Sequence, residues 1–102
     1  MEVLVRVPTP LRSLVAGARS VVLDVSPSGL AGDGTAVTVG AVLDTLAVEH
    51  PPLERRVRDE LGRVRVHVNL FVGADNIRDL DGLTTAVSPG AELSIIPAIS
   101  GG

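Results

Sequence analysis

The last two residues, Gly101 and Gly102, are the ones whose type and position could do chemistry. Because glycine has no Cβ, two glycines pack nothing and make a poor end for a structural strand. They could instead carry a carboxylate through a narrow channel and leave its carbonyl open to nucleophiles. An α-carboxyl group has a pKa of about 3.5. Gly102 would therefore be an anion at neutral pH, able to attack the α-phosphorus of ATP in the site of another protein.

The strand that must position this carboxylate is predicted over residues 92–98. Ser88-Pro89-Gly90-Ala91 predicts a tight turn before it. Pro97 removes a backbone donor near the end of the strand, which favours departure of the chain from the sheet. Residues 99–102 then form a tail, which reaches roughly 13 Å at about 3.3 Å per residue.

Two segments near the start predict a pair of neighbouring strands. Residues 2–7 alternate, with three valines on one face, as in a half-buried strand. Pro8 and Pro10 end it, and residues 20–25 predict its hairpin partner after a wide turn. Residues 26–36 predict a Gly-rich surface loop, which lacks the Gly-Lys-Ser/Thr ending of a phosphate-binding loop.

A third strand is predicted over residues 64–72, which alternate strictly. Its apolar face would hold Val64, Val66, Val68, Leu70 and Val72. Phe71 falls on the opposite face. Residues 73–76 predict a turn, and residues 77–78 predict a brief extended piece.

One amphipathic helix is predicted over residues 39–49. Its apolar residues recur at helical spacing and are Val39, Val42, Leu43, Leu46 and Ala47. Thr38 is suited to cap the first turn with its hydroxyl. The sequence His50-Pro51-Pro52 ends the helix, because the residue before a proline avoids the α conformation. Residues 53–62 predict a short charged helical turn.

The order strand, strand, helix, strand, short strand, strand predicts an α+β protein with a β-grasp (ubiquitin-like) roll. One main helix can cover only one face of a mixed sheet of four to five strands. The first and last strands can then pair in parallel, with the helix crossing the sheet. We expect a single domain over residues 1–98 and a flexible tail over residues 99–102.

Composition argues against several classes of function. The chain of 102 residues carries a net charge of −3, one aromatic residue and no cysteine. We therefore expect no nucleic-acid partner, no disulfide and no thiolate metal site. His50 and His67 lack the spacing of a metal site, so neither a metal nor a cofactor of its own is expected. No stretch approaches the ~20 apolar residues that span a bilayer, and no signal-peptide pattern is present, which predicts a cytoplasmic protein.

Six segments, taken together, resemble a known family. They are Pro8–Arg12, Thr38–Val42, Val68–Val72, Asp75–Arg78, Gly82–Val87 and Ser94–Ala98, the last leading into Gly101-Gly102. They resemble the MoaD/ThiS family of ubiquitin-like sulfur carriers, and especially the actinobacterial sulfur carriers that serve a cysteine synthase. The last two segments are the most specific. The loop over residues 26–36 departs from the resemblance, because it is longer than we expect for the family.

The resemblance implies a carrier rather than an enzyme. A ubiquitin-activating-like enzyme, acting as adenylyltransferase and sulfurtransferase, would use ATP to adenylate Gly102. A sulfur donor would convert the acyl adenylate to a thiocarboxylate, and a client synthase would take the sulfur. The favoured client is a pyridoxal-phosphate cysteine synthase or a thiolating enzyme of secondary metabolism.

Other readings of the same tail remain open. The chain could be the small subunit of a molybdopterin synthase, the carrier for a thiazole synthase, or a ubiquitin-like modifier joined through Gly102 to lysines of target proteins. It could also be a non-covalent interaction domain with an idle tail. An enzyme with its own active site is the least supported, since no nucleophile–base pair or metal cluster is visible.

A partner surface is predicted beside the tail. In the last strand Leu93 and Ile95 should face the core, which leaves Ile96 outside. Phe71 and Ile96 could then form an exposed apolar patch, a feature that often marks an interface. The residues predicted to bind partners are Phe71, Ile96, Pro97, Ala98, Ile99 and Ser100. Arg65 and Arg78 are expected to be solvated.

Overall fold

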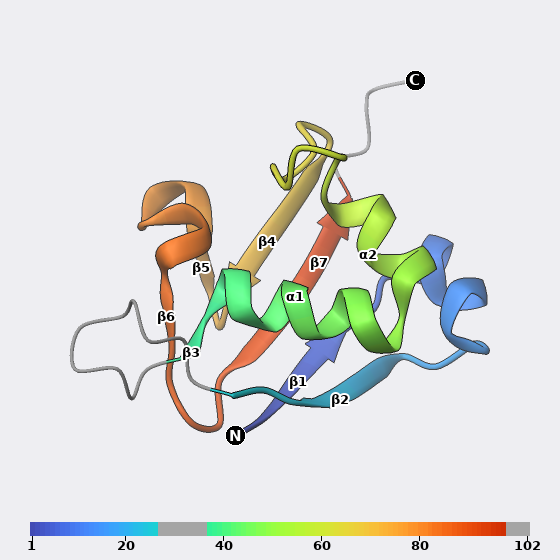
Figure 1. Cartoon of the computed structure of the whole chain (residues 1–102), viewed down its shortest axis with the longest axis horizontal. Helices are drawn as coiled ribbons and strands as arrows, with labels where there is room; N and C mark the ends of the chain where they lie inside the picture. The colour runs from blue at the N-terminus through green and yellow to red at the C-terminus, as the bar shows by residue number, and fades with distance from the viewer. Residues whose placement is uncertain (27–36, 98–102) are drawn as a thin grey trace.

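The computed structural model describes residues 1–26 and 37–97, and its main sheet has five strands in the order β2-β1-β7-β4-β5 (Figure 1). The strands are β1 (Glu2–Arg6), β2 (Ser20–Asp24), β4 (Val68–Val72), β5 (Asp75–Asn76) and β7 (Glu92–Pro97). The first and last strands, β1 and β7, pair in parallel, whereas the other neighbours are antiparallel. This mixed sheet with β7 in its middle is the predicted β-grasp.

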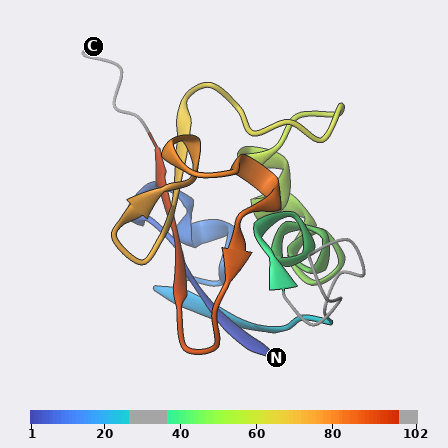
Figure 2. The ribbon, with the colours of Figure 1, turned by 90° about the vertical axis from the view of Figure 1, so that its left-hand side faces the viewer.

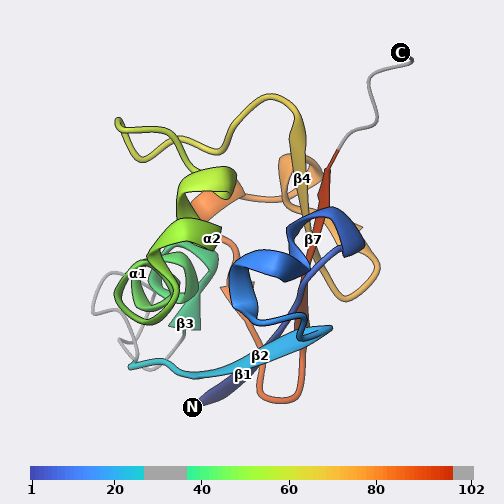
Figure 3. The same cartoon turned by 90° about the vertical axis from the view of Figure 1, so that its right-hand side faces the viewer.

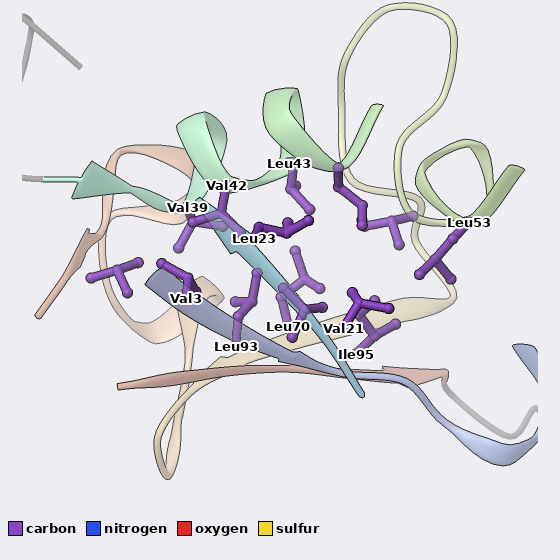
Figure 4. Close-up of a cluster of buried hydrophobic side chains, with 14 of the residues drawn as sticks. Val3, Val21, Leu23, Val39, Val42, Leu43, Leu53, Leu70, Leu93 and Ile95 are labelled. Carbon is purple, nitrogen blue, oxygen red and sulfur yellow. The ribbon is translucent and has the colours of Figure 1, made fainter. Parts of the chain in front are cut away.

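Helix α1 (Val39–Glu49) covers one face of the sheet, with the bounds that the sequence predicts. Its first turn is capped as expected, because the Thr38 hydroxyl accepts the N–H of Ala41 at 3.1 Å. The predicted stripe is buried at Val39, Val42, Leu43 and Leu46, and Ala47 is half-buried. Figure 4 shows this stripe packed on side chains from the sheet, which include Val3, Leu23, Leu70 and Leu93. The core is therefore made almost entirely of valine, leucine and isoleucine.

A second helix, α2 (Pro51–Val57), begins immediately after α1. The prolines end α1 as predicted, but they also start α2, since proline is well suited to the first helical positions. The short helical turn predicted over residues 53–62 is thus placed too late. The chain between β1 and β2, predicted only as a wide turn, contains the 3₁₀ helix η1 (Thr9–Val15). Within residues 1–26 and 37–97, no helix is long and apolar enough to cross a membrane.

A small second sheet, which the sequence did not predict, flanks the start of α1 (Figure 2). It pairs β3 (Val37–Thr38) with β6 (Ala86–Val87), next to the 3₁₀ helix η3 (Gly82–Thr84). A Cβ at Gly40 would lie 3.2 Å from the carbonyl oxygen of Leu83. Glycine at this position therefore lets η3 approach the first turn of α1.

The strand predicted over residues 64–72 is wrong in its first half. Strand β4 begins at Val68, and Val66 is 75% exposed. The chain turns here instead, since the N–H of Val68 donates to the carbonyl oxygen of Arg65 at 3.0 Å. Near this turn the chain makes only an isolated bridge between Val64 and Arg58.

The extended piece predicted over residues 77–78 is also wrong. Residues Ile77–Asp79 form the 3₁₀ helix η2, and the short strand β5 lies just before it, where a turn was predicted. The side chain of Asn76 explains the helix, since its Oδ1 accepts the N–H of Arg78 at 3.0 Å. An Asn side chain that bonds the backbone two residues on favours a turn over an extended chain.

Candidate functional site

Strand β7 carries the chain to Pro97 at one end of the molecule (Figures 1 and 3). It is held on both sides, by β1 through Leu4–Arg6 and by β4 over Val68–Val72. Leu93 and Ile95 are buried as predicted. The chain beyond Pro97 therefore starts from a strand fixed by its neighbours and by the core. The predicted site residues Ala98, Ile99, Ser100, Gly101 and Gly102 lie outside the described residues.

The outer patch, defined as Phe71 and Ile96, lies on the face of the sheet opposite α1. Ile96 is 46% exposed and Phe71 is half-buried. Phe71 is opposite Ser94 in the register of β4 and β7, and Ile96 is opposite Asn69. The two apolar residues are therefore diagonal neighbours on one face, a relation in which long or aromatic side chains can meet.

The rest of this outer face mixes apolar and charged groups. Leu4 and Val22 lie opposite each other on β1 and β2. Between them and the outer patch, Arg6 Nε lies 2.8 Å from Glu92 Oε2. Both of these charged side chains are well exposed, so the pair contributes little to stability. The apolar area near the end of β7 is thus bordered by a charged pair.

The side chain of Arg78 is exposed, as predicted, but hydrogen bonds also hold its guanidinium in a defined place. Its guanidinium donates to the carbonyl oxygens of Val68 at 3.0 Å and Val66 at 3.3 Å, and to Asn69 Oδ1 at 3.1 Å. A planar guanidinium with five donors suits such a cluster of acceptors. Arg78 thereby shapes the turn that leads into β4. Sequence reasoning missed this role, because the acceptors are mostly backbone carbonyls.

Helices α2 and η1 lie close to the start of β4 and the end of β7 (Figure 3). A cleft of about 530 Å³ lies among these elements. We call it the basic cleft, and its lining residues are Leu11, Arg55, Arg56, Arg65, His67, Val68 and Pro97. Arg65 Nε donates to the carbonyl oxygen of Arg55 at 2.9 Å. Arg65, predicted to be solvated, is exposed, but this bond and the cleft give it a defined place.

Ionisable groups beside the basic cleft are paired with each other. Burial disfavours the charged form of Arg58, but hydrogen bonds to Glu54 at 2.6 Å and Asp44 at 3.0 Å outweigh it and raise the pKa of Arg58. The backbone N–H groups of Arg63 and Leu61, the first most strongly, lower the pKa of the Asp59 carboxyl. These bonds hold the end of α2 and the loop after it.

Metal ligands do not gather in the part of the chain that the structure describes: no three His, Asp or Glu residues there could share an ion. His67 lines the basic cleft, whereas His50 joins α1 to α2. The fold and this end of the molecule define a ubiquitin-like β-grasp protein.

Comparison with known proteins identifies the family. Residues 27–102 match the ThiS family, so the chain belongs to that family. It is 33% identical to the sulfur carrier protein CysO of Mycobacterium tuberculosis over 104 residues, covering 100% of both chains. The predicted MoaD/ThiS resemblance is therefore confirmed.

Solved structures confirm the fold. The crystal structure of the Amycolatopsis orientalis BexX/CysO complex matches with a TM-score of 0.75 at 30% identity, covering 98% of this chain and 99% of that one. The crystal structure of SAMP1, a small archaeal modifier protein from Haloferax volcanii, matches with a TM-score of 0.77 at 30% identity over 100% of both chains. In sequence, small archaeal modifier protein 1 of the same organism is 39% identical over 88 residues, 86% of this chain and 87% of its own length.

Proposed function

We propose that this chain is a sulfur carrier that works through the carboxylate of Gly102. A ubiquitin-activating-like enzyme adenylates the carboxylate with ATP and releases pyrophosphate. Hydrosulfide then attacks the acyl carbon, AMP leaves, a proton is released, and a thiocarboxylate remains on Gly102. The observation that carries the proposal is that β7, fixed on both sides, delivers the chain at one end of the molecule shortly before Gly101-Gly102. The match to CysO along the full length supports it.

The chain acts in this scheme as a co-substrate, with no cofactor of its own. Its fold holds the start of the tail, and the outer patch docks the activating enzyme beside it. Exposed apolar residues near the end of β7 are suited to this, because apolar contacts provide much of the energy of an interface. The predicted partner-binding residues Pro97, Ala98, Ile99 and Ser100 contact the enzyme where the tail enters it. Both the chain and its partners are proposed to work in the cytoplasm.

The client that takes the sulfur is a biosynthetic synthase. We favour a pyridoxal-phosphate cysteine synthase or a thiolating enzyme of secondary metabolism. Two comparisons support this choice: the similarity to CysO, a sulfur carrier protein, and the similarity to a CysO that forms a complex with BexX. A thiocarboxylate suits either client, because its sulfur is a soft nucleophile that the tail can deliver into an enclosed site.

A protein modifier is the second candidate function. The similarity to a small archaeal modifier protein favours it, at 39% identity over 88 residues. It shares the adenylation step, but a lysine amine of a target protein then attacks the acyl carbon. The product is an isopeptide bond, which is stable to thiol reductants.

Intact-mass spectrometry separates the two candidates. The purified chain is incubated with ATP, its activating enzyme and hydrosulfide, and the expected change is one oxygen exchanged for sulfur at Gly102. A chain without Gly102 is the control and should stay unchanged. When cell extract is added to supply target proteins, covalent conjugates that resist reducing agent, in place of the exchange, would favour the modifier. An unchanged wild-type mass with an enzyme that adenylates other carriers would contradict both.

A further inference from the structure

The basic cleft combines two kinds of surface. Its polar part consists of three arginines and a histidine, all of which are exposed: Arg55, Arg56, Arg65 and His67. Its apolar part consists of Leu11, Val68 and Pro97, which are half-buried or buried. The two parts come from distant positions in the chain, which α2, η1 and the ends of β4 and β7 bring together (Figure 3). One ligand could therefore meet cations and an apolar surface at once.

The positive charge of the cleft is local. Residues 53–67 hold five arginines and three carboxylates, in a chain whose net charge is −3. Two of these carboxylates already have partners, since Glu54 bonds Arg58 and Asp59 bonds Arg63. The third, Glu60, lines an adjoining depression with Arg55 and Arg65, outside the basic cleft. No carboxylate lines the cleft itself among the residues described.

The wall of the cleft is organised by hydrogen bonds before any ligand arrives. Arg65 donates from its backbone N–H to the carbonyl of Val57 at 2.9 Å and from Nε to the carbonyl of Arg55 at 2.9 Å. Arg78, from the other side, holds the carbonyls of Val66 and Val68. A surface formed in advance loses less conformational freedom when it binds.

We propose that the basic cleft binds an acidic segment of a protein, in which an apolar side chain is flanked by carboxylates. The apolar side chain packs on Leu11, Val68 and Pro97, and the carboxylates face the arginines. Because Pro97 is the last described residue of β7, this protein would be the enzyme that acts on Gly102, an assignment that rests on the proposed function. The cleft would thus align the enzyme with the tail.

An acidic protein segment fits the cleft better than a free phosphate does. A phosphate site surrounds the ion with convergent donors, often backbone N–H groups at a helix start. Here the cations are exposed arginines and the remaining lining is apolar, which a phosphate would not use. Arginine can also bind carboxylates through two parallel hydrogen bonds. The chemistry of the whole lining therefore favours a peptide.

Backbone-amide NMR of the full chain can test this directly. The probe is the capped peptide Glu-Asp-Leu-Glu-Asp, compared with its uncharged isostere Gln-Asn-Leu-Gln-Asn and with inorganic phosphate. We expect saturable shifts at Arg56, Arg65 and Val68 with a Kd below about 1 mM, weakened by added salt. The isostere should give none. No saturable shift at millimolar peptide, or equal binding of the isostere, would overturn the proposal.

Charge-reversal variants complete the test. Arg56→Glu and Arg65→Glu should each weaken peptide binding about fivefold or more, while the matched control Arg19→Glu, exposed and outside the cleft, should change it less than about twofold. An equal loss of peptide affinity in the Arg19→Glu control would indicate that only the overall charge of the chain attracts the peptide. Saturable shifts of the same amides with phosphate alone would indicate a site for small anions. Either result would reject the proposed occupant.

Deletion of Gly102 separates this inference from the proposed function. The shortened chain should bind the acidic peptide as well as the wild type does, yet accept no sulfur. If the wild type binds no peptide but gains sulfur, the cleft proposal fails alone. If it binds the peptide but gains no sulfur with a competent activating enzyme, the carrier proposal fails, and with it the assignment of the partner.

Discussion

The two faces of the main sheet are built from the same strands but differ in what their residues contact. On the inner face, Leu23, Leu70 and Leu93 are essentially inaccessible to solvent beneath α1. On the outer face, Val22 and Ile96 are 56% and 46% exposed. Residues adjacent in sequence therefore have different roles. The inner face stabilises the fold, and the outer face is available to other molecules.

The sharpest test of this difference uses two neighbouring residues of β2. Leu23→Ala should lower the free energy of unfolding by about 2–5 kcal/mol, because it removes buried methyl groups and leaves a cavity. Val22→Ala, one residue earlier and exposed, should change it by less than about 0.5 kcal/mol. Urea unfolding followed by circular dichroism measures both. Similar losses in the two variants would refute the assignment of faces.

Substitutions in the outer patch should weaken binding of the activating enzyme. Phe71→Ser and Ile96→Ser should each raise the KM of the activating enzyme for this chain about tenfold, equivalent to about 1.4 kcal/mol, with kcat retained. The reason is that each loses apolar contact with the enzyme but leaves Gly102 intact. Val22→Ser, on the same face but at the edge strand β2, is the matched control and should leave KM unchanged. Unchanged KM in both patch variants would remove the patch from the proposed interface.

The inner face also depends on how α1 starts. Thr38→Ala should lower the free energy of unfolding by about 1 kcal/mol, because the N–H of Ala41 loses its acceptor. Thr38→Ser keeps the hydroxyl and should retain most of the stability. Thermal unfolding of the three proteins checks this order. A serine variant as unstable as the alanine variant would show that packing of the threonine methyl, and not the cap, is what matters.

The smallest effect on the free energy of unfolding is expected at Asp59, which lies on neither face of the main sheet. Its pKa is lowered in the folded chain, chiefly by the N–H of Arg63. The stability that it contributes is therefore present above the unfolded pKa, about 3.9, and is lost as the pH falls through the lower folded value. Asp59→Asn should be less stable than the wild type at neutral pH, and the difference should shrink as the solution is acidified below pH ~4. Urea unfolding across this range measures it, and a gap that widens on acidification would contradict the assignment.

The sequence predicted an element correctly wherever the segment with the local pattern also packs against a neighbouring element. The stripe and cap of α1 and the alternation of residues 2–7 and 92–98 predicted elements that the structure contains, apart from Ala98, which lies outside the described residues. Alternation failed over residues 64–67, where valines follow the period of a strand but the chain turns, with the N–H of Val68 donating to the carbonyl oxygen of Arg65. The small sheet of β3 and β6 escaped prediction, since each of its strands has only two residues.

Some features of the candidate site could also be predicted from local sequence, and others could not. Gly101-Gly102, the exposure of Ile96 and the inward position of Leu93 and Ile95 could be proposed from residue types and the two-residue period. The basic cleft could not, because its lining comes from η1, α2, the segment between α2 and β4, β4 itself and β7. Nor could the bonds of Arg78, whose backbone acceptors have no signature in the sequence.

The sequence by itself thus determined the elements and the face of each residue within them, because periodicity and capping are properties of a few neighbouring residues. It also placed the glycine pair that carries the proposed chemistry. Only the tertiary structure decided which strands are long enough to pair, and that Arg55, Arg56 and Arg65 converge with Leu11 and Pro97 on one cleft. Such arrangements depend on contacts between residues that are distant along the chain, and packing of the core brings those residues together.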